Sequence, residues 1–265
     1  MEKSKLLDRC GALGEDRLLL AKVLDRAEQT ERRSIPAATD FLSPAQRVQA
    51  EDLLRLAGIS ETAFASSGGY PEAERRILLF LPDWLDREEA DSQSPLRCLR
   101  AAFRPEEAPT HRDFLGSLMG LGIVREKVGD ILVGPESADL IVLDTVADFL
   151  LQNWTSAGRT HLTVTAIPPE ELRIPETRME EVRDTVSSLR LDAVIASALR
   201  MARGKASELV ERGAVQVNWR PCAKPDKLIA EGDTVSARGF GKFQLAQVGS
   251  LTKKGRIAIV VRRYV

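Results

Sequence analysis

The sequence predicts a folded α+β protein of more than one domain, and three observations lead to this prediction. The chain has 265 residues, which is more than one small domain usually holds. Hydrophobic residues make up 43% of it, enough to build sizeable cores. The spacing of apolar residues is helical at first, strand-like after Arg76, and helical again after Leu189. We therefore expect a helical N-terminal region, a mixed central domain and a mixed C-terminal domain.

Residues 1–70 are predicted to form the helical N-terminal domain. The segment 15–33 carries an apolar stripe that gives way to charged residues, as expected for an amphipathic helix that leaves a core. A second helix is marked by Ser43 as its N-cap, Pro44 at its first position and Gln46 as the partner in a capping box. A Gly-Gly pair and a Tyr-Pro pair then end the helical region.

Residues 71–170 are predicted to form a ferredoxin-like domain. From Leu96 onward the pattern is strand, helix, strand, strand, helix, strand, which is the βαββαβ order of ferredoxin-like and RNA-recognition-type domains. The predicted segments are 96–103, 111–122, 128–134, 138–144, 145–158 and 161–167. The apolar run 77–82 is predicted as a further strand at the edge of this sheet. The acidic stretch 171–187 is predicted to be a linker that becomes a short helix.

Residues 188–265 are predicted to form a third domain that opens with two helices. In the first, apolar residues from Leu191 to Leu199 recur at helical spacing. The second follows from Arg203 and stops at Gly213. Short strands are then predicted at 214–218, 234–239, 243–248 and 257–263.

Charge is divided unevenly along the chain. The formal net charge is −1, but residues 1–187 carry −10 and residues 188–265 carry +9. A strongly basic segment is typical of a module that binds a polyanion. The charge distribution therefore predicts that a nucleic-acid site lies in the C-terminal domain.

Several classes of function find no support in the sequence. The apolar runs are far shorter than the roughly 18 residues of a membrane span, and the N-terminus lacks the apolar core of a secretory signal. We therefore expect a cytoplasmic protein with no membrane partner. Cys10, Cys98 and Cys222 lie far apart and form no CxxC pair, which argues against disulfides and zinc. His111 and His161 lie outside any metal-ligand spacing, so no metal or cofactor is expected.

Residues 189–237 resemble the S4-type (alpha-L) RNA-binding domain. The matching positions are Arg190, Leu191 and Asp192 at the start of the first helix, Arg203, Lys205 and Ala206 at the start of the second, Gly213, Val215, Val217 and Asn218 in the turn and strand that follow, Lys224 and Pro225, and Gly232, Asp233 and Val235. Two positions depart from the usual pattern: Ala202 replaces a Ser, and Trp219 stands where a Gly often completes the turn. Trp219 is expected either to stack on a base or to cover the edge of the core.

The predicted RNA-binding residues are polar or basic and lie at the start of the second helix or on the segments around it. Cationic side chains and free backbone N–H groups at a helix start can both face phosphate oxygens. The set comprises Arg190, Arg200, Arg203, Lys205, Arg212, Asn218, Lys224, Lys227, Arg238 and Lys242. Secondary RNA contacts are expected at Arg112, Arg125 and Lys127 in the central domain.

Three further stretches, 68–76, 111–133 and 238–265, extend the resemblance to nearly the whole chain, which is similar to the YlmH-type bacterial S4-domain proteins. The resemblance implies a non-enzymatic RNA-binding protein. It further implies that the protein binds ribosomal RNA on the large ribosomal subunit and serves ribosome-associated quality control with peptidyl-tRNA. Its partners are then ribosomal RNA and the large subunit, direct contact with tRNA is left open, and we expect a monomer.

The sequence also leaves two other functions open. An accessory RNA-modifying factor, related to pseudouridine synthases or methyltransferases, would use the S4-type domain for RNA delivery. Arg-Leu-Asp also surrounds the catalytic aspartate of pseudouridine synthases, but Asp192 lies inside a predicted helix, where it is expected to cap or to pair locally. The glycine-containing stretch 239–242 lacks the strand-to-helix context of a nucleotide loop and indicates a tight turn. Alternatively, the acidic region 1–187 would serve as a protein-interaction scaffold.

Overall fold

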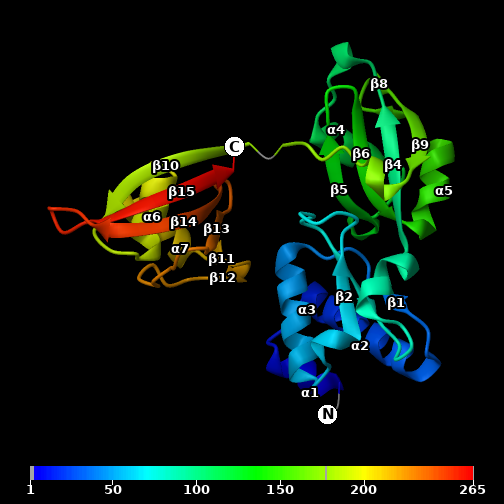
Figure 1. Ribbon diagram of the computed structural model, residues 1–265, viewed down its shortest axis with the longest axis horizontal. Helices are drawn as coiled ribbons and strands as arrows, with labels where there is room; N and C mark the ends of the chain where they lie inside the picture. Colours follow the sequence, from blue (N-terminus) through cyan, green and yellow to red (C-terminus); the bar gives the residue numbers. More distant parts are fainter. Residues whose placement is uncertain (1–2, 177, 265) are drawn as a thin grey trace. The chain divides into compact units, whose positions relative to one another are not determined.

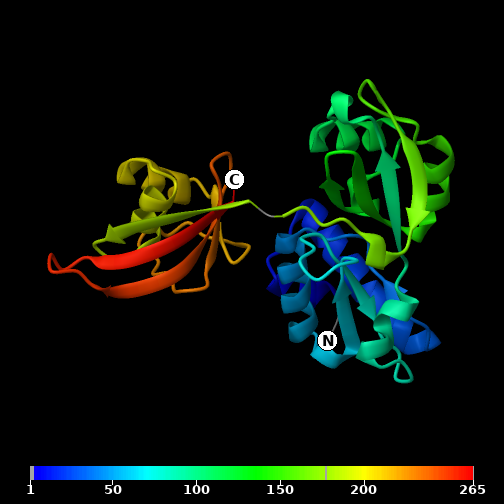
Figure 2. The ribbon, with the colours of Figure 1, turned by 45° about the horizontal axis from the view of Figure 1, so that its top comes forward.

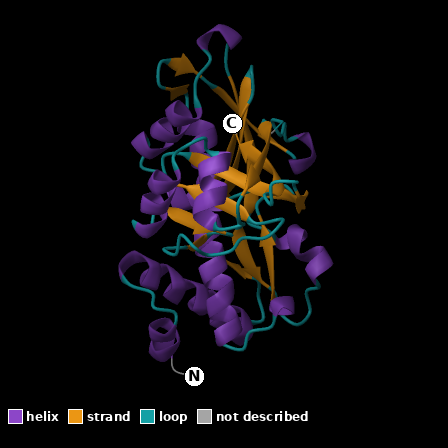
Figure 3. Cartoon of the chain, turned by 90° about the vertical axis from the view of Figure 1, so that its left-hand side faces the viewer, coloured by secondary structure: helices purple, strands orange, loops and turns teal. Residues whose placement is uncertain are grey.

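The computed structural model describes residues 3–176 and 178–264 and divides into two compact units, Met1–Pro175 and Glu176–Val265 (Figure 1). Helices and strands occur in both units, which confirms the predicted α+β class. Figure 3 shows the helices in purple and the strands in orange. Within the described residues, the strands form sheets of three, four and six strands and one two-stranded pair. The boundaries predicted at 70/71 and 187/188 stay predictions.

The N-terminal part of the first unit contains three helices, α1 (Lys3–Arg9), α2 (Gly14–Arg33) and α3 (Pro44–Leu56). The predicted capping box at the start of α3 is confirmed. Gln46 donates its backbone N–H to Ser43 Oγ at 3.4 Å, and the Ser43 backbone N–H donates to Gln46 Oε1 at 2.8 Å. The apolar faces of the three helices share one core.

A small antiparallel sheet lies against these helices. Its strands are β1 (Ala37–Ala38), β2 (Phe64–Ser67) and β3 (Ile77–Phe80), in the order β1-β3-β2. The strand predicted at 77–82 is therefore present, but its predicted place at the edge of the central sheet is wrong. All four residues of β3 are buried because both of its edges and both of its faces are covered, which explains why the run is continuously apolar.

The ferredoxin-like topology of the central domain is confirmed. Its sheet has the order β5-β6-β4-β9, every neighbouring pair is antiparallel, and α4 and α5 cover one face. The elements are β4 (Leu96–Ala102), α4 (His111–Gly120), β5 (Val128–Val133), β6 (Ser137–Leu143), α5 (Asp144–Asn153) and β9 (Thr163–Ile167). Short 3-10 helices lie at Glu61–Ala63, Arg87–Gln93, Pro105–Glu107, Arg125–Lys127 and Pro169–Glu171.

The helix predicted over 145–158 ends earlier, at Asn153. Trp154 leaves the helical conformation, with φ −89 and ψ 88, and its ring is buried against the domain core. A two-stranded pair, β7 (Ser156–Ala157) and β8 (Thr160–His161), follows it. Burial of the large indole therefore ends α5 before Gly158.

Part of the second face of the central sheet is covered by residues of the N-terminal region. Phe41 and Ile77 are fully buried in one cluster with Ile141 of the sheet. The contact is close, because a Cβ built on Gly129 would lie 2.7 Å from the Phe41 ring. An RNA-recognition domain stacks bases on this face of its sheet. Here the part of the face around Ile141 belongs to a core, whereas Ala102, Thr163 and Thr165 on the same face are exposed.

Arg75 stabilises the contact between the N-terminal region and the central sheet. Its guanidinium donates hydrogen bonds to the backbone oxygens of Val128 at 3.0 Å and Phe41 at 3.1 Å. Burial lowers the pKa of Arg75 to about 10. The side chain thus links the N-terminal region to strand β5 through main-chain acceptors.

The second unit is a six-stranded antiparallel sheet with two helices on one face, and its strands β10, β15 and β14 lie side by side (Figure 2). The strand order is β10-β15-β14-β13-β11-β12. The elements are β10 (Met179–Val186), α6 (Leu191–Ala198), α7 (Arg203–Glu211), β11 (Val215–Val217), β12 (Arg220–Pro221), β13 (Thr234–Ala237), β14 (Gly241–Leu251) and β15 (Ile257–Tyr264).

The short helix predicted at the end of the 171–187 linker is wrong, because Met179–Val186 forms strand β10. All eight residues pair with β15. Val182 and Val186 contribute to the core of the unit, while residues between them are polar. A strand with one polar face has few apolar residues. In this acidic stretch, the alternation of apolar and polar residues in β10 is therefore hard to recognise.

No helix in the described ranges 3–176 and 178–264 is long and apolar enough to cross a membrane.

Helix α7 begins without a side-chain cap, so adding a cap is expected to stabilise it. Ala202 occupies the N-cap position with φ −65 and ψ 140, and it has no side-chain hydrogen bond to offer. Ala202→Ser is expected to stabilise the second unit by about 1 kcal/mol, because a serine Oγ can accept from a free N–H of the first turn. Urea denaturation, monitored by the hydrogen exchange of α7 peptides, measures this change in stability.

The matched control is Ala223→Ser, which changes an exposed loop alanine and should alter stability by less than about 0.5 kcal/mol. Equal stabilities of the wild type and the Ala202→Ser protein would contradict the capping argument.

Candidate nucleic-acid interface

A buried carboxylate joins the starts of α6 and α7. Asp192 is 4% exposed and accepts hydrogen bonds from two guanidinium groups. Arg190 donates to it at 3.2 and 3.1 Å, and Arg203 donates at 3.1 and 3.2 Å. This fork-to-fork geometry fixes the orientation of both arginine side chains.

The Asp192 carboxyl stays ionised in this setting. Burial by itself raises its pKa, but the hydrogen bonds from Arg190 and Arg203 outweigh burial, so the pKa of Asp192 lies below its usual value. The side chains of Arg190 and Arg203 are 38% and 50% exposed. Each guanidinium therefore turns one edge to Asp192 and keeps surface toward solvent, where a phosphate can approach.

The loop 224–227 brings two lysines to the same place. The backbone oxygens of Pro225 and Lys227 accept hydrogen bonds from Asp192 at 3.0 Å and Leu191 at 2.8 Å. These bonds satisfy N–H groups at the start of α6 and hold the loop against it. Lys224 and Lys227 are both exposed. The structure thus gathers four predicted cations, Arg190, Arg203, Lys224 and Lys227, around the start of α6.

Lys205 and Lys242 each lie over aromatic rings. The ammonium of Lys205, in the first turn of α7, is 5.0 Å from the centre of the Phe240 ring. The ammonium of Lys242 is 4.0 Å from the centre of the Tyr264 ring and 5.3 Å from that of Trp219. Such contacts hold a flexible lysine near an aromatic surface.

Trp219 occupies an unusual backbone position. It lies in the turn between β11 and β12, where Asn218 has φ 49 and Trp219 has φ 64. Two consecutive positive φ values define the tight hairpin turn that normally takes Asn-Gly. The Trp219 side chain is half-buried beside Lys242, so it covers part of the sheet.

Asn218 serves the turn through its side-chain amide. Its Nδ2 donates to Asp233 at 2.7 Å, and its Oδ1 accepts from the backbone N–H of Thr234 at 2.9 Å. These bonds explain why asparagine stands at this position. Arg238 is exposed in the turn between β13 and β14.

Two predicted cations lie away from the start of α7. Arg200, which has φ 51, pairs with Glu180 of β10 at 3.1 Å. Arg212 follows the C-terminal end of α7, and its Nε donates to the backbone oxygen of Glu208 at 3.2 Å. The structure does not bring these two side chains together with the others.

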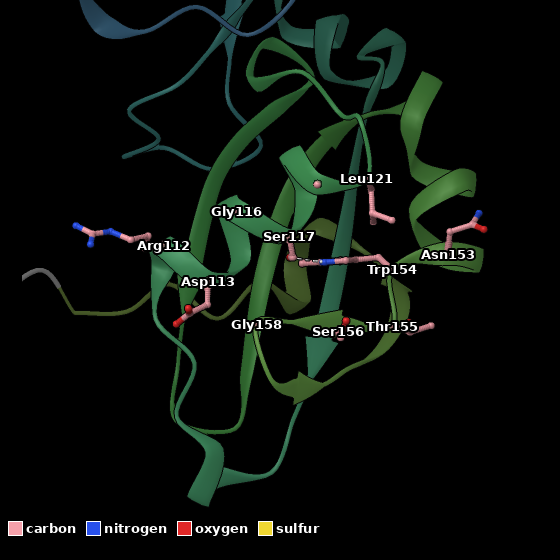
Figure 4. A pocket seen from close by; sticks show the side chains of 11 residues that line it. Arg112, Asp113, Gly116, Ser117, Leu121, Asn153, Trp154, Thr155, Ser156 and Gly158 are labelled. Atoms are coloured by element: carbon pink, nitrogen blue, oxygen red, sulfur yellow. Dashed lines mark hydrogen bonds between the residues drawn. The ribbon is translucent and has the colours of Figure 1, made fainter.

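Among the predicted secondary residues, Arg112 lines a cavity of about 460 Å³ between α4 and the chain after α5. Figure 4 shows its side chain extending away from the other lining residues, while Trp154 points toward Ser117 and donates to its Oγ at 2.8 Å. Gly116 and Gly120 leave one face of α4 open there. Arg112 is exposed and able to meet an anion.

Arg125 and Lys127 are engaged in the fold. Arg125 is half-buried and donates to the backbone oxygen of Gly129 at 3.0 Å, and burial lowers its pKa. Lys127 pairs with Asp40 at 2.7 Å. Arg125 therefore stabilises the start of β5, and Lys127 links the central domain to the N-terminal region.

Sequence reasoning missed Phe240 as a member of this surface and missed that Asp192 joins two of the predicted arginines. A signal for Phe240 was available, because an aromatic residue between two glycines at a tight turn is displayed to solvent. The four-way contact of Asp192 had no local signal, since Arg203 lies eleven residues away in the chain. In the described part of the chain, no three His, Cys, Asp or Glu side chains gather closely enough to hold a metal ion.

Comparison with known proteins gives matches to three family models. They are described as "YlmH, N-terminal" over residues 15–83, "Putative RNA-binding domain in YlmH" over residues 107–171 and "S4 domain" over residues 189–235. A similar protein is the "Ribosome-associated protein quality control protein P2" of Bacillus subtilis (strain 168). It is 36% identical over 249 residues, which cover 94% of this chain and 95% of the relative.

A similar solved structure is the "Cell division protein ylmH from Streptococcus pneumoniae". The TM-score is 0.52 at 24% sequence identity, and the match covers 62% of this chain and 97% of the other. This likeness concerns the fold alone.

Proposed function

Because the chain belongs to the YlmH family of S4-domain proteins, we propose that it is a non-enzymatic factor that binds ribosomal RNA on the large ribosomal subunit. Its work there is ribosome-associated quality control, in which it helps to hold peptidyl-tRNA. The name of the Bacillus subtilis relative supports the part of this proposal that concerns ribosome-associated quality control.

The observation that carries the proposal is the cluster of cations at the starts of α6 and α7, inside the matched S4 segment. Arg190 and Arg203 present oriented guanidinium groups, and Lys205 adds a charge at the uncapped start of α7. Phosphate oxygens accept hydrogen bonds from such groups and from free helix N–H groups. The surface reads the backbone and shape of a folded RNA, which is the usual way to recognise double-helical RNA.

The mechanism uses Asp192 as a structural anchor and not as a catalyst. A pseudouridine synthase requires an aspartate that reaches the substrate, whereas the carboxyl of Asp192 is buried and engaged by two arginines. This engagement speaks against the RNA-modifying alternative at that residue.

Sedimentation tests the proposal. The wild-type protein, mixed with separated ribosomal subunits on sucrose gradients, is expected to travel with the large subunit at about 50 mM salt and to be released substantially at about 200 mM, because phosphate contacts are salt-dependent. Sedimentation with the small subunit, or with neither, would contradict the proposal.

Ribonuclease separates this function from scaffolding. Under the proposed function, partners recovered from cells with the protein are lost after ribonuclease treatment. Under the scaffold alternative they are retained. Crosslinking in cells, followed by sequencing of the attached RNA, then reports whether tRNA is contacted together with large-subunit RNA.

A further inference from the structure

The hairpin between β13 and β14 displays a phenyl ring to solvent. Phe240 lies in this turn and is 42% exposed. Its backbone N–H donates to the oxygen of Ala237 at 2.9 Å, which closes the turn. Exposed hairpin turns usually carry Gly, Asn, Asp or Ser, because these residues suit the backbone and remain solvated. An aromatic side chain at this position is therefore unusual for an exposed hairpin turn.

Two glycines set the conformation of the turn around Phe240. Gly239 has φ 80 and Gly241 has φ 118, values that L side chains rarely adopt. A Cβ built on either glycine meets no atom within 4 Å, so backbone conformation and not packing requires glycine here. Phe240 is consequently the one side chain that the Gly-Phe-Gly segment presents.

The ring lies beside the proposed phosphate site. The ammonium of Lys205 is 5.0 Å from the centre of the Phe240 ring, and Lys205 belongs to the first turn of α7. Arg238 is exposed two residues before Phe240 in the same turn. An aromatic surface thus adjoins cations at the start of a helix, within a unit whose residues 188–265 carry a net charge of +9.

We propose that Phe240 stacks on an unpaired base of the RNA whose phosphates contact Arg203 and Lys205. The inference rests on the proposed function and names the chemistry of its ligand: a nucleotide outside a double helix, next to a paired segment. Charge complementarity and the continuity of Phe240 with the start of α7 favour RNA over an apolar protein segment as the occupant.

The requirement for an unpaired base follows from geometry. Bases inside an A-form helix are stacked on one another, and the deep major groove admits no side chain to their faces. A phenyl ring on a hairpin turn can reach a base face only where the base is bulged, looped or terminal. Every base has such a face, so stacking adds affinity without strict sequence preference.

The test compares, with the full-length protein, two RNA hairpins whose loop is a non-nucleotide linker without unpaired bases and which differ in a single bulged nucleotide. The wild type is expected to bind the bulged hairpin more tightly than the fully paired one. Phe240→Ala should weaken binding to the bulged hairpin about 10-fold, the effect of truncating a stacked aromatic, and leave the paired hairpin unchanged. Phe240→Trp should retain the preference. The matched control is Leu251→Ala, an exposed apolar side chain at the far end of β14, which should bind both hairpins as the wild type does.

A photochemical readout locates the contact. With 5-iodouridine at the bulged position, irradiation is expected to crosslink the RNA to the peptide that contains Phe240, as identified by mass spectrometry. Equal affinities of the wild type for the two hairpins, an unchanged preference in Phe240→Ala, or a crosslink elsewhere would overturn the stacking assignment. Failure of the proposed function looks different, since the wild type would then bind neither hairpin, or Arg203→Ala with Lys205→Ala would leave binding to both unchanged.

Discussion

Replacing Arg203 and Lys205 together with alanine is expected to weaken binding to ribosomal RNA by roughly 10- to 100-fold, the loss anticipated for two charge-assisted contacts. Both residues lie in the first turn of α7, where the backbone N–H groups are uncapped. The two changes remove the charges that stand nearest to that helix start.

The dependence of affinity on salt provides a second measure of the same double variant. Each cation that neutralises a phosphate releases bound counterions, and removing one such cation changes the slope of log affinity against log salt by about 0.7 to 0.9. Titration of RNA by fluorescence anisotropy at several salt concentrations should therefore show a flatter slope as well as a weaker affinity.

A matched variant separates local contacts from overall charge. Lys253→Ala with Lys254→Ala removes the same net charge from the exposed hairpin between β14 and β15. It should bind RNA nearly as the wild type does. If the two double variants were weakened equally, the start of α7 would not be the site. Asp192 keeps its pair with Arg190 when Arg203 is removed, so the fold of the unit should persist, which circular dichroism checks.

Asp139→Ala is expected to destabilise the first unit by about 3–5 kcal/mol, because it leaves a partner charge unpaired in the interior. Asp139 is 1% exposed in β6. It accepts hydrogen bonds from Arg100 Nε at 2.8 Å, Arg100 Nη2 at 2.7 Å and the backbone N–H of Arg173 at 2.8 Å. The carboxylate therefore links β6 to the neighbouring strand β4 and to the segment around Arg173 that follows β9.

Hydrogen exchange of peptides that cover β4 and β6 measures this loss of stability within the whole protein. The double change Arg100→Ala with Asp139→Ala should cost less than the sum of its single changes, since neither charge is then left alone. Asp148→Ala, at an exposed position of α5, should change stability by less than about 0.5 kcal/mol. Unchanged exchange in the Asp139→Ala protein would contradict the structural role of this network.

The central fold could be predicted from the sequence because its signals are local. Each strand and helix from Leu96 onward shows its own apolar spacing, and the ferredoxin-like order follows from the sequence of elements. The partners of Ile77–Phe80 could not be predicted in this way, because a strand that is buried on both faces carries no mark of its neighbours. Met179–Val186 was missed for the opposite reason, since its charged face conceals the alternation.

The candidate site shows the same division. The cations at Arg190, Arg203 and Lys205 could be predicted because they belong to a sequence pattern. The sequence could not predict whether a given cation is free to bind RNA, because the ion pairs that engage it involve residues far away in the chain. Lys127, for instance, is paired with Asp40, which lies 87 residues earlier.

The covered part of the second face of the central sheet constrains which substitutions the protein can tolerate. Phe41 and Ile77 complete a core that Ile141 and its neighbours begin, so the regions predicted as 1–70 and 71–170 depend on each other for burial. Neither region can be exchanged, duplicated or deleted without exposing apolar surface on the other. Substitutions in the helical N-terminal part must therefore stay compatible with the ferredoxin-like part across this shared core, whereas the basic C-terminal unit has a core of its own.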